Sequence, residues 1–414
     1  MRIGTVKGTN DYLPLEVALR EFIQNSILET YRQNGFERIM TPALEDIENL
    51  DKSDGGDNLS LIFKILKRGD KLNNAIKRSL FRELSDIGLR YDLTLPLSRY
   101  YANNRQNLIS PLKCIQIDKV YRAENPQKGR EREFVQCDID IIGSDSIYCE
   151  IELINVTAKA LLAVGLKNFK VRINDRSILM NLLLSIGFKQ DEIATVCVTF
   201  DKLGKIGIEG ITNELSKKGF SIENINTLTS ELQKLPLSLD YIKTISTLTD
   251  RICSLEKIIS DVRFLSENKY DIEFDLSLVR GQGYYTGTVF EIESRDFNSS
   301  VAGGGRYDNL IGKFINENVP AVGFSIGFER IFNILTNNNF PIPSRKKIAI
   351  LFENNFLEAN KLADELRNEY DVALYEKPKK LNKFLNSLQE NEFYGFMVCG
   401  QPNDIKILRQ PITD

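Results

Sequence analysis

The stretch that decides the fold is YRAENPQKGREREFVQCDIDIIG, residues 121–143. Apolar and polar residues alternate on both sides of a loop rich in glycine and charge, which predicts two antiparallel strands with a long connection. Arg122 falls on the first strand. Because strand side chains alternate with a period of two, the second strand presents three polar side chains on one face, those of Gln136, Asp138 and Asp140.

These residue types suit a ligand that carries both a negative and a positive group. A guanidinium group such as that of Arg122 matches a phosphate, and a row of amide and carboxylate acceptors matches a cation. A solvated hairpin without a ligand is an equal alternative for this stretch alone.

A second stretch, DLSLVRGQGYYTGTVFEI (275–292), places one arginine, Arg280, between apolar residues and glycines. Gly281 and Gly283 would let the backbone approach a ligand closely, and Tyr284 and Tyr285 offer an aromatic wall with hydroxyl groups. A β-bulge is the alternative interpretation. A third stretch, AGGGRYD (302–308), could form a phosphate-binding nest, but taken alone it favours a tight turn.

Composition narrows the class of protein. With 414 residues and 42% hydrophobic content, the chain can bury two or three domain cores. Its amino terminus lacks a signal-peptide core and no stretch reaches membrane-span length, so we expect a cytoplasmic protein. A net charge of −3 argues against a protein that coats nucleic acid, and any RNA contact must be local.

The chain contains no histidine, so an imidazole cannot serve as its general base or metal ligand. Six scattered cysteines without a C-x-x-C pair suggest neither a zinc site nor a disulfide framework. Chemistry must therefore rest on carboxylates, guanidinium groups, tyrosines and backbone dipoles.

The chain divides into segments of different periodicity. The first 45 residues indicate an amphipathic helix and then the strand GFERIMTP (35–42), and residues 69–83 form a charged, helix-prone insertion. Helical runs from about 174 to 261 have few strand signals. Strand character returns at DIEFDLSL and TGTVFEIES, GFSIGFERIFNIL predicts a strand running into a helix, and strand and helix alternate after the linker 337–346, as in a small α/β domain.

Taken together and in this order, the motifs resemble the histidyl-tRNA synthetase family over nearly the whole chain. GFERIMTP resembles motif 1, YRAENPQKGREREF motif 2 and AVGFSIGFERI (321–331) motif 3. LRYDLTLPLSRY (89–100) resembles the amino-acid loop, and LVRGQGYYTGTVFE (278–291) and GGGRYD resemble the two histidine signatures. The resemblance implies an α+β fold: a class II synthetase-like antiparallel sheet flanked by helices, with a helical insertion and a carboxy-terminal α/β domain.

The resemblance also implies domain limits and partners. The catalytic core would occupy 1–173 and 263–338, a mainly helical insertion 174–262, and a shortened anticodon-binding-like domain 346–414. Histidine, ATP with Mg²⁺, and tRNA(His) would be the ligands. Because motif 1 pairs across a two-fold axis in this class, a homodimer is expected.

Carried over position by position, the family pattern gives each site residue a role. ATP would be bound by Arg122, Glu124 and Arg330, with Glu124 near the adenine. Histidine would be bound by Asp92 and Thr94 at its amino group and by Gln136, Asp140, Tyr284 and Tyr285, the last three around the imidazole. Arg280 would be the catalytic arginine that neutralises the α-phosphate under carboxylate attack. No general base is needed, since the attacking carboxylate is already ionised.

Departures from the family pattern leave alternatives open. Asn125 stands where motif 2 usually has arginine, Glu131 where it has an aromatic residue, and Gln282-Gly283 replaces the middle pair of a histidine signature. The leading hypothesis is a histidine–tRNA ligase. One alternative is a non-catalytic paralog resembling the ATP phosphoribosyltransferase regulatory subunit, although such subunits have eroded ATP-site arginines. Another is a paralog that activates histidine without tRNA.

Overall fold

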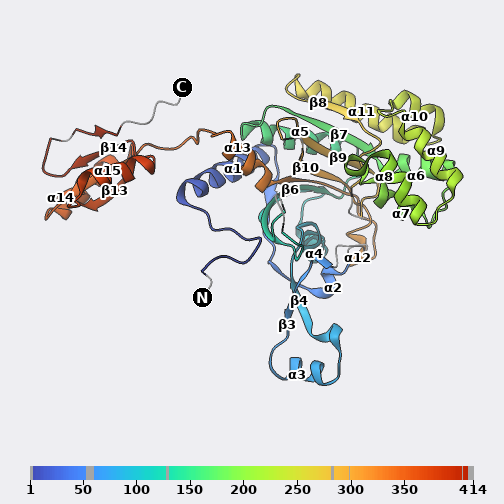
Figure 1. Ribbon diagram of the computed structural model, residues 1–414, viewed down its shortest axis with the longest axis horizontal. Helices are drawn as coiled ribbons and strands as arrows, with labels where there is room; N and C mark the ends of the chain where they lie inside the picture. Colours follow the sequence, from blue (N-terminus) through green and yellow to red (C-terminus); the bar gives the residue numbers. More distant parts are fainter. Residues whose placement is uncertain are drawn as a thin grey trace. The chain divides into compact units, whose positions relative to one another are not determined.

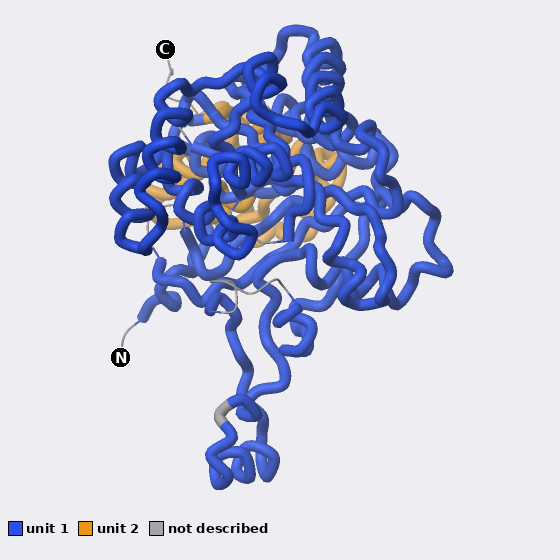
Figure 2. Tube along the Cα trace, turned by 90° about the vertical axis from the view of Figure 1, so that its right-hand side faces the viewer, with its two compact units in different colours: residues 1–12, 20–339 blue, residues 13–19, 340–414 orange. Residues whose placement is uncertain are grey.

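The computed structural model describes residues 3–52, 60–126, 130–280, 284–297, 299–402 and 404–408, and Figure 1 labels its helices and strands. The chain forms two compact units, which Figure 2 distinguishes by colour. Unit 1 comprises residues 1–12 and 20–339, and unit 2 comprises residues 13–19 and 340–414. Within the described ranges, no helix is long and apolar enough to cross a membrane.

Unit 1 is organised around an eight-stranded sheet in the order β1-β5-β6-β11-β10-β9-β7-β8. Its inner pairings are antiparallel, as predicted, whereas the two outermost pairs, β1 with β5 and β7 with β8, are parallel. The strands are β1 (Glu37–Arg38), β5 (Leu112–Tyr121), β6 (Glu133–Ile142), β7 (Phe169–Asp175), β8 (Asp271–Phe274), β9 (Thr288–Ser294), β10 (Ser299–Arg306) and β11 (Ala321–Gly327).

The hairpin predicted from residues 121–143 is present. β5 and β6 pair from Leu112–Ile142 to Tyr121–Glu133. Arg122 lies one residue beyond β5, although its N–H still donates to the Arg132 carbonyl at 2.8 Å. The motif 1 strand is shorter than predicted, since only two residues of GFERIMTP pair with β5.

Helices with apolar faces cover this sheet. α5 (Tyr148–Ala163) is buried along most of its length and contacts β11, α11 (Thr249–Ser266) contacts β7 and β8, and α13 (Phe328–Asn337) contacts β6. α1 (Pro14–Gln33) buries Ile23 and Ile27 completely, in agreement with the predicted amphipathic helix. α4 (Thr94–Asn104), which directly follows Asp92 and Leu93, contacts both α2 (Ile47–Leu50) and α12 (Gly312–Ile315).

The glycine run of β10 corrects the interpretation of AGGGRYD. Residues 299–306 form an inner strand between β9 and β11, not a tight turn or a phosphate-binding nest. A Cβ at Gly305 would lie 2.6 Å from the Thr288 carbonyl oxygen, and one at Gly304 would overlap the backbone of Gly323. The run is therefore glycine because neighbouring strands and side chains approach it closely.

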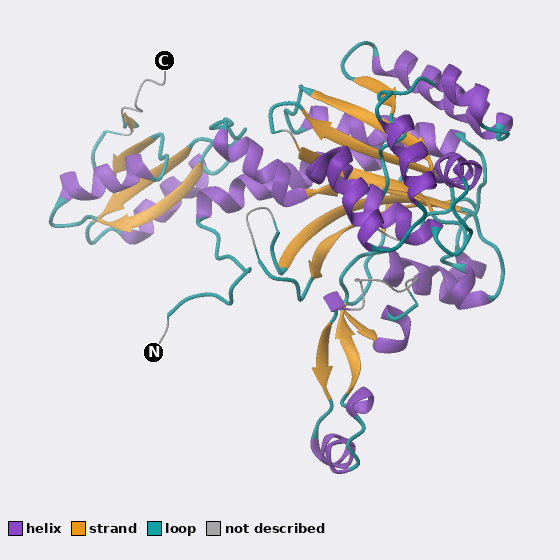
Figure 3. Ribbon diagram, turned by 45° about the vertical axis from the view of Figure 1, so that its right-hand side comes forward, coloured by secondary structure: helices purple, strands orange, loops and turns teal. Residues whose placement is uncertain are grey.

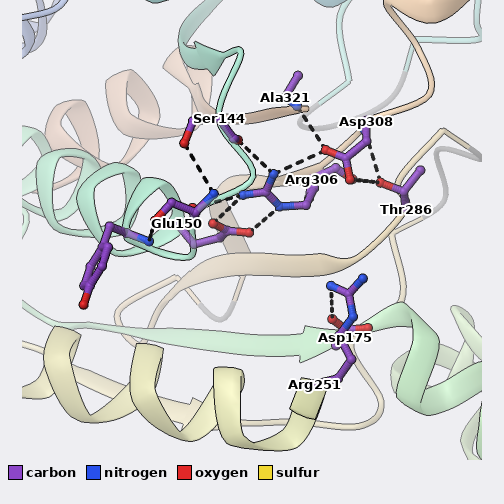
Figure 4. A network of polar contacts seen from close by, with 10 residues as sticks. Ser144, Glu150, Asp175, Arg251, Thr286, Arg306, Asp308 and Ala321 are labelled. Atoms are coloured by element: carbon purple, nitrogen blue, oxygen red, sulfur yellow. Dashed lines mark hydrogen bonds and ion pairs between the residues drawn. The ribbon is translucent and has the colours of Figure 1, made fainter. Parts of the chain in front are cut away.

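A buried ion pair fixes the end of β10. Arg306 donates through Nε and Nη2 to both carboxylate oxygens of Glu150, each at 2.7 Å, and both side chains are almost fully buried. Figure 4 shows this pair with Asp308, whose carboxylate lies 3.3 Å from Arg306 Nη1 and accepts from the Ala321 N–H at 3.0 Å. The pair therefore ties β10 to the first turn of α5.

A separate three-stranded sheet leads away from this body. β2 (Leu44–Asp46), β4 (Ser85–Leu89) and β3 (Phe63–Leu66) pair antiparallel in the order β2-β4-β3. Between β3 and β4 lie α3 (Gly69–Lys77) and the 3₁₀ turn η2 (Phe81–Glu83), in the segment predicted to be helix-prone. Figures 1 and 3 show residues 63–89 projecting from the body of unit 1, with α3 at the far end. We call this segment the arm.

Between β7 and β8 the chain is helical, as its periodicity predicts. The helices are α6 (Arg176–Ile186), α7 (Ile193–Phe200), α8 (Leu203–Lys217), α9 (Ile222–Leu232), α10 (Leu239–Ile245) and α11. The limits 174–262 of an inserted domain remain a prediction, because these helices cluster with unit 1.

Unit 2 contains the predicted alternation of strand and helix. It holds β12 (Lys347–Phe352), α14 (Phe356–Leu366), β13 (Asp371–Glu376), α15 (Leu381–Glu390), β14 (Gly395–Val398) and β15 (Lys406–Ile407). The sheet order is β13-β12-β14-β15, with only the β14–β15 pair antiparallel. Two small apolar clusters, which include Leu351 and Ile350, form its core.

Candidate active site

A cavity of about 790 Å³ opens over the inner strands of unit 1, and every site residue predicted from the sequence lines it. The ten residues come from β6, from the region just before and at the start of α4, from the connection between β5 and β6, from the segment before β9, and from α13. They are Asp92, Thr94, Arg122, Glu124, Gln136, Asp140, Arg280, Tyr284, Tyr285 and Arg330. Segments far apart in the sequence therefore meet in one site.

One side of the cavity is a cluster of acceptors. Gln136, Asp138 and Asp140 line it together from one face of β6, as the period of two predicts. Gln136 Nε2 donates to Ser325 Oγ at 3.0 Å, and the Tyr307 hydroxyl donates to Asp140 Oδ1 at 2.6 Å. Most of this cluster is buried, so each of its acceptors needs a partner.

Asp92 adds a buried carboxylate to this side. Its Oδ1 accepts from the Leu95 N–H at 3.2 Å in the first turn of α4. Its Oδ2 and the Oε1 of Gln136 are buried without a hydrogen-bond partner among the described residues. Two unpaired acceptors that line one cavity are a specific signal, because an unsatisfied buried polar atom costs about 1–3 kcal/mol. A ligand that donates hydrogen bonds would satisfy them.

The protonation of this side depends on burial. Burial raises the pKa of Asp92 to about 6, and the neighbouring Leu95 N–H and Arg122 offset part of that rise. Burial likewise raises the pKa of Asp140 to about 7, with the Tyr307 hydroxyl opposing the shift and Asp92 adding to it. The pKa of Asp138 is well above its usual range, from burial and from Asp140 nearby. Carboxylates so disposed favour a cationic ligand, which would stabilise their ionised forms.

Tyrosines form the wall next to these acceptors. The ring centroids of Tyr284 and Tyr285 lie 4.8 Å apart, and those of Tyr284 and Tyr307 lie 6.0 Å apart in an edge arrangement. All three side chains are buried and belong to one apolar cluster with Leu95. Packing therefore fixes the wall in place, as recognition of a planar ring requires.

Arg280 also lines the cavity, where it lies directly over the glycine run. A Cβ at Gly303 would overlap the Arg280 guanidinium, so this glycine provides the space that the arginine occupies. Arg280 Nη1 donates to Glu291 Oε2 on β9 at 2.9 Å, and Glu291 also lies 3.6 Å from Arg172, which pairs with Asp275. Burial lowers the pKa of Arg280, but nearby groups, chiefly Tyr285 and Glu291, together raise it by more than burial lowers it. The net shift is upward, so the guanidinium stays charged.

Two further arginines surround the same space. Arg122 donates from Nε to the Tyr91 carbonyl at 3.1 Å, and its guanidinium lies 4.9 Å from the centre of the Phe134 ring. Arg330, on α13, donates to the Ser300 carbonyl. Burial lowers the pKa of Arg330, and the positive charges of Arg280 and Arg130 lower it further against the opposing effect of Glu291. Positive charges are thus crowded where an anionic ligand would relieve them.

Glu124 lines the cavity beside this group. Its carboxylate lies 3.4 Å from Arg130 Nη1, and its backbone carbonyl accepts from Arg132 Nε at 3.1 Å. Arg132 in turn donates its N–H to the carbonyl of Gly8, so the amino-terminal segment holds this part of the hairpin.

Several lining residues were not selected from the sequence. Glu291 was detectable as a charged residue within an apolar strand run, and Tyr307 as part of the quoted AGGGRYD stretch. Asp201, between α7 and α8, and Lys205, in the first turn of α8, also line the cavity, and no local pattern identifies them. The predicted contribution of Gly281, Gln282 and Gly283 lies outside the described residues.

A mostly antiparallel sheet that holds arginines and buried carboxylates around one cavity is the arrangement of a class II aminoacyl-tRNA synthetase. The sequence profile of the family described as Histidyl-tRNA synthetase matches residues 8–331. The chain belongs to the histidyl-tRNA synthetase family, and it is accordingly an enzyme of the aminoacyl-tRNA ligase type.

Individual relatives agree with this assignment. The chain is 42% identical over 349 residues to a histidine–tRNA ligase of Leifsonia xyli, spanning 80% of this chain and 79% of the relative. It is 35% identical over 416 residues to a histidine–tRNA ligase of Cytophaga hutchinsonii, spanning 95% and 92%. Histidyl-tRNA synthetase from Nostoc sp. PCC 7120 superposes with a TM-score of 0.78 at 26% identity, covering 96% of this chain and 91% of that one.

A further solved structure shares the fold. The structure described as an ATP phosphoribosyltransferase regulatory subunit/histidyl-tRNA synthetase from Bacillus halodurans superposes with a TM-score of 0.78 at 21% identity. At that identity the likeness concerns the fold alone.

Proposed function

We propose that the chain is a histidine–tRNA ligase that activates histidine with ATP and transfers it to tRNA(His). One observation carries this proposal: a single cavity is lined both by unpaired buried acceptors and by three arginines. Histidine offers an ammonium group and a ring to the acceptors and their tyrosine wall, and ATP offers phosphates to the arginines.

In the first step, a carboxylate oxygen of histidine attacks the α-phosphorus of ATP. The bond from that phosphorus to the bridging oxygen of pyrophosphate breaks, and pyrophosphate leaves with the bond's electron pair. Histidyl-adenylate remains. No proton has to be removed from the nucleophile, so the absence of histidine side chains from the chain is no obstacle.

We assign the amino group of histidine to the unpaired oxygens of Asp92 and Gln136, with Thr94 at the start of α4 beside them. Asp140, held by the Tyr307 hydroxyl, and the ring pair Tyr284 and Tyr285 would enclose the imidazole. Because these groups are already packed and hydrogen-bonded, little order has to be gained when the ligand enters.

The arginines would act on the phosphates. We assign Arg280 to the non-bridging oxygens of the α-phosphate, where negative charge grows in the transition state, and Arg122 and Arg330 to the phosphates of bound ATP. Glu124 would contact the adenine end. Glu291 positions Arg280, since it accepts a hydrogen bond from the guanidinium and holds it from β9.

Mg²⁺ belongs to this proposal as a companion of ATP. Among the described residues, no group of three or more Cys, Asp or Glu side chains could hold a metal ion. Mg²⁺ commonly binds through substrate phosphates with one or two carboxylates, so a dedicated cage is not required. When bound, it would supply further positive charge to the phosphates.

In the second step, a ribose hydroxyl at the 3′ end of tRNA(His) attacks the carbonyl carbon of the adenylate. The bond from that carbon to the phosphate oxygen breaks, and AMP leaves with the electron pair while the hydroxyl proton passes to its phosphate. We propose that a homodimer performs both steps in the cytoplasm, with motif 1 at the two-fold axis. One chain has a mass of 47.2 kDa. Light scattering at micromolar protein should return twice that mass, and a single-chain mass would contradict the dimer.

Two assays test the function together. ATP–pyrophosphate exchange that depends on histidine tests activation, and attachment of labelled histidine to tRNA(His) tests transfer. We expect both. Exchange without charging would support the tRNA-independent activator, and absence of exchange would support the regulatory paralog.

A further inference from the structure

The arm, residues 63–89, differs in charge from the rest of the chain. It carries seven basic and three acidic side chains, a net charge of +4 in a chain whose total is −3, so the remainder carries −7. Six of the seven basic side chains are exposed, and the seventh, Lys67, is half-buried. The basic residues are Lys64, Lys67, Arg68, Lys71, Lys77, Arg78 and Arg82.

These charges are not neutralised within the protein. None of the seven forms an ion pair with another residue in the described part of the chain. Arginines at and beyond the base of the arm behave differently: Arg90 pairs with Asp118 at 2.8 Å, and Arg99 pairs with Glu45 at 2.6 Å. The arm therefore presents unpaired positive charge to its surroundings, most of it around α3 at the tip.

The arm is also separate from the proposed chemistry. None of its residues lines the cavity, whose boundary on this side is formed by Leu61, Tyr91 and Asp92. Figures 1 and 3 both show α3 projecting away from the large sheet. A change in the charge of the tip should therefore leave the cavity intact.

We propose that the arm binds the phosphate backbone of RNA and, with it, the tRNA substrate. This rests on the proposed function. A surface with clustered, exposed and unpaired Lys and Arg is the feature that phosphate backbones recognise, and each contact releases a counterion. Asn73 and Asn74, exposed in α3, add amide groups that can donate to phosphate or sugar oxygens.

The alternative binding partner for the arm is a second copy of the chain. The arm exposes apolar side chains, among them Leu66 at 58% and Ile76 at 57%. Four of the seven cations are lysines, however, and lysine is depleted in protein–protein interfaces. The charge therefore favours RNA, and a subunit contact becomes an outcome of the test.

The test neutralises the tip in the full-length protein. The variant combines Lys71→Gln, Lys77→Gln, Arg78→Gln and Arg82→Gln, and its matched control keeps every charge through Lys71→Arg, Lys77→Arg, Arg78→Lys and Arg82→Lys. Fluorescence anisotropy with labelled tRNA(His) transcript, repeated over a range of salt concentrations, measures affinity and its salt dependence. Histidine-dependent exchange and light scattering are measured on the same samples.

We expect the neutral variant to bind the transcript at least roughly 10-fold more weakly. If all four cations contact phosphates, the negative slope of log affinity against log salt should become shallower by about 3. The charge-retaining control should bind like the unaltered protein, and exchange should be unchanged in both. Unaltered affinity and slope in the neutral variant would overturn the proposal. Loss of the dimer would also overturn it, because the arm would then be a subunit contact. Absence of exchange in the unaltered protein would instead refute the proposed function, which separates the two failures.

Discussion

The guanidinium of Arg280 lies against the backbone of Gly303, in space that any side chain at position 303 would fill. The glycine is on β10 and the arginine is on the segment before β9, so the strand itself forms the floor of the arginine's site. We predict that Gly303→Ala displaces the guanidinium and lowers the rate of histidine-dependent ATP–pyrophosphate exchange by roughly 10-fold or more, because a misplaced donor loses transition-state stabilisation.

The neighbouring glycine provides the comparison. At Gly304 a Cβ would overlap the backbone of Gly323, so Gly304→Ala should destabilise the sheet itself. At Gly303 the overlap is with the end of a flexible side chain, so that variant should fold. In an Arg280→Ala background, Gly303→Ala should cost little more activity, since both changes act through one group. Fully additive losses would show that Gly303 does not act through Arg280.

Arg280 itself should affect the rate more than the binding of histidine. Arg280→Ala should reduce exchange by roughly 10²-fold or more, the loss typical of one transition-state donor, while histidine affinity changes far less. Arg280→Lys should recover only part of the rate, because lysine keeps the charge but loses the planar fork. The measurement is steady-state exchange with histidine and ATP varied separately.

Arg295→Ala is the matched control for that experiment. Arg295 is exposed, pairs with Asp271 at 2.6 Å and does not line the cavity, so its removal should leave exchange unchanged. If Arg280→Ala raised the KM for histidine and left the maximal rate intact, Arg280 would be a binding residue and its catalytic assignment would be wrong.

Much of the fold follows from local patterns. The β5–β6 hairpin, the strand-to-helix run into α13, the helices between β7 and β8 and the alternation in unit 2 all appear as periodicity in the sequence, because each element buries a face of its own. The length of β1 could not be predicted this way. Only two of its residues find a partner on β5, and partner strands are not visible in a local window.

The site was predictable where a motif was continuous. Gln136 and Asp140 share a face of one strand, and that follows from spacing alone. The glycine run was misread because its cause is tertiary: its neighbours are Arg280, Tyr285 and the backbones of β9 and β11. Glu291, which holds Arg280, likewise depends on a contact between separate segments.

The Arg306–Glu150 pair should be important for stability. Removing one partner of a buried, bidentate ion pair leaves an uncompensated charge, so Glu150→Ala should lower the free energy of unfolding by about 3–5 kcal/mol. Glu152→Ala, in the same helix, is the control. It breaks a pair with Lys113 in which both side chains are about one-third exposed, and such pairs contribute about 0–1 kcal/mol. Denaturant titration should separate the two variants, and equal losses would contradict the assignment.

Asp92 should couple histidine binding to pH. Its pKa is about 6 in the free protein, chiefly because it is buried. An ammonium group beside Oδ2 would stabilise the ionised form and lower that pKa, so histidine binding near pH 6 should release a proton from Asp92, and affinity should fall as the pH drops further. Calorimetry in buffers of different ionisation enthalpy counts the protons. Asp92→Asn should bind histidine more weakly and lose this part of the release.

The free energy of unfolding gives a second test of Asp92, and Asp92→Asn should change it in the opposite direction to histidine affinity. Because the folded pKa of Asp92 lies above its ordinary value, folding favours the protonated form, and that contribution is lost as pH rises through about 6. Asp92→Asn should therefore stabilise the free protein at pH 8 while weakening histidine binding, a combination that a folding defect cannot produce. Binding of imidazolepropionate, which lacks the amino group, should release the same number of protons from the unaltered protein and from Asp92→Asn. If histidine binding also released equal numbers of protons from these two proteins, its amino group would not be bound at Asp92.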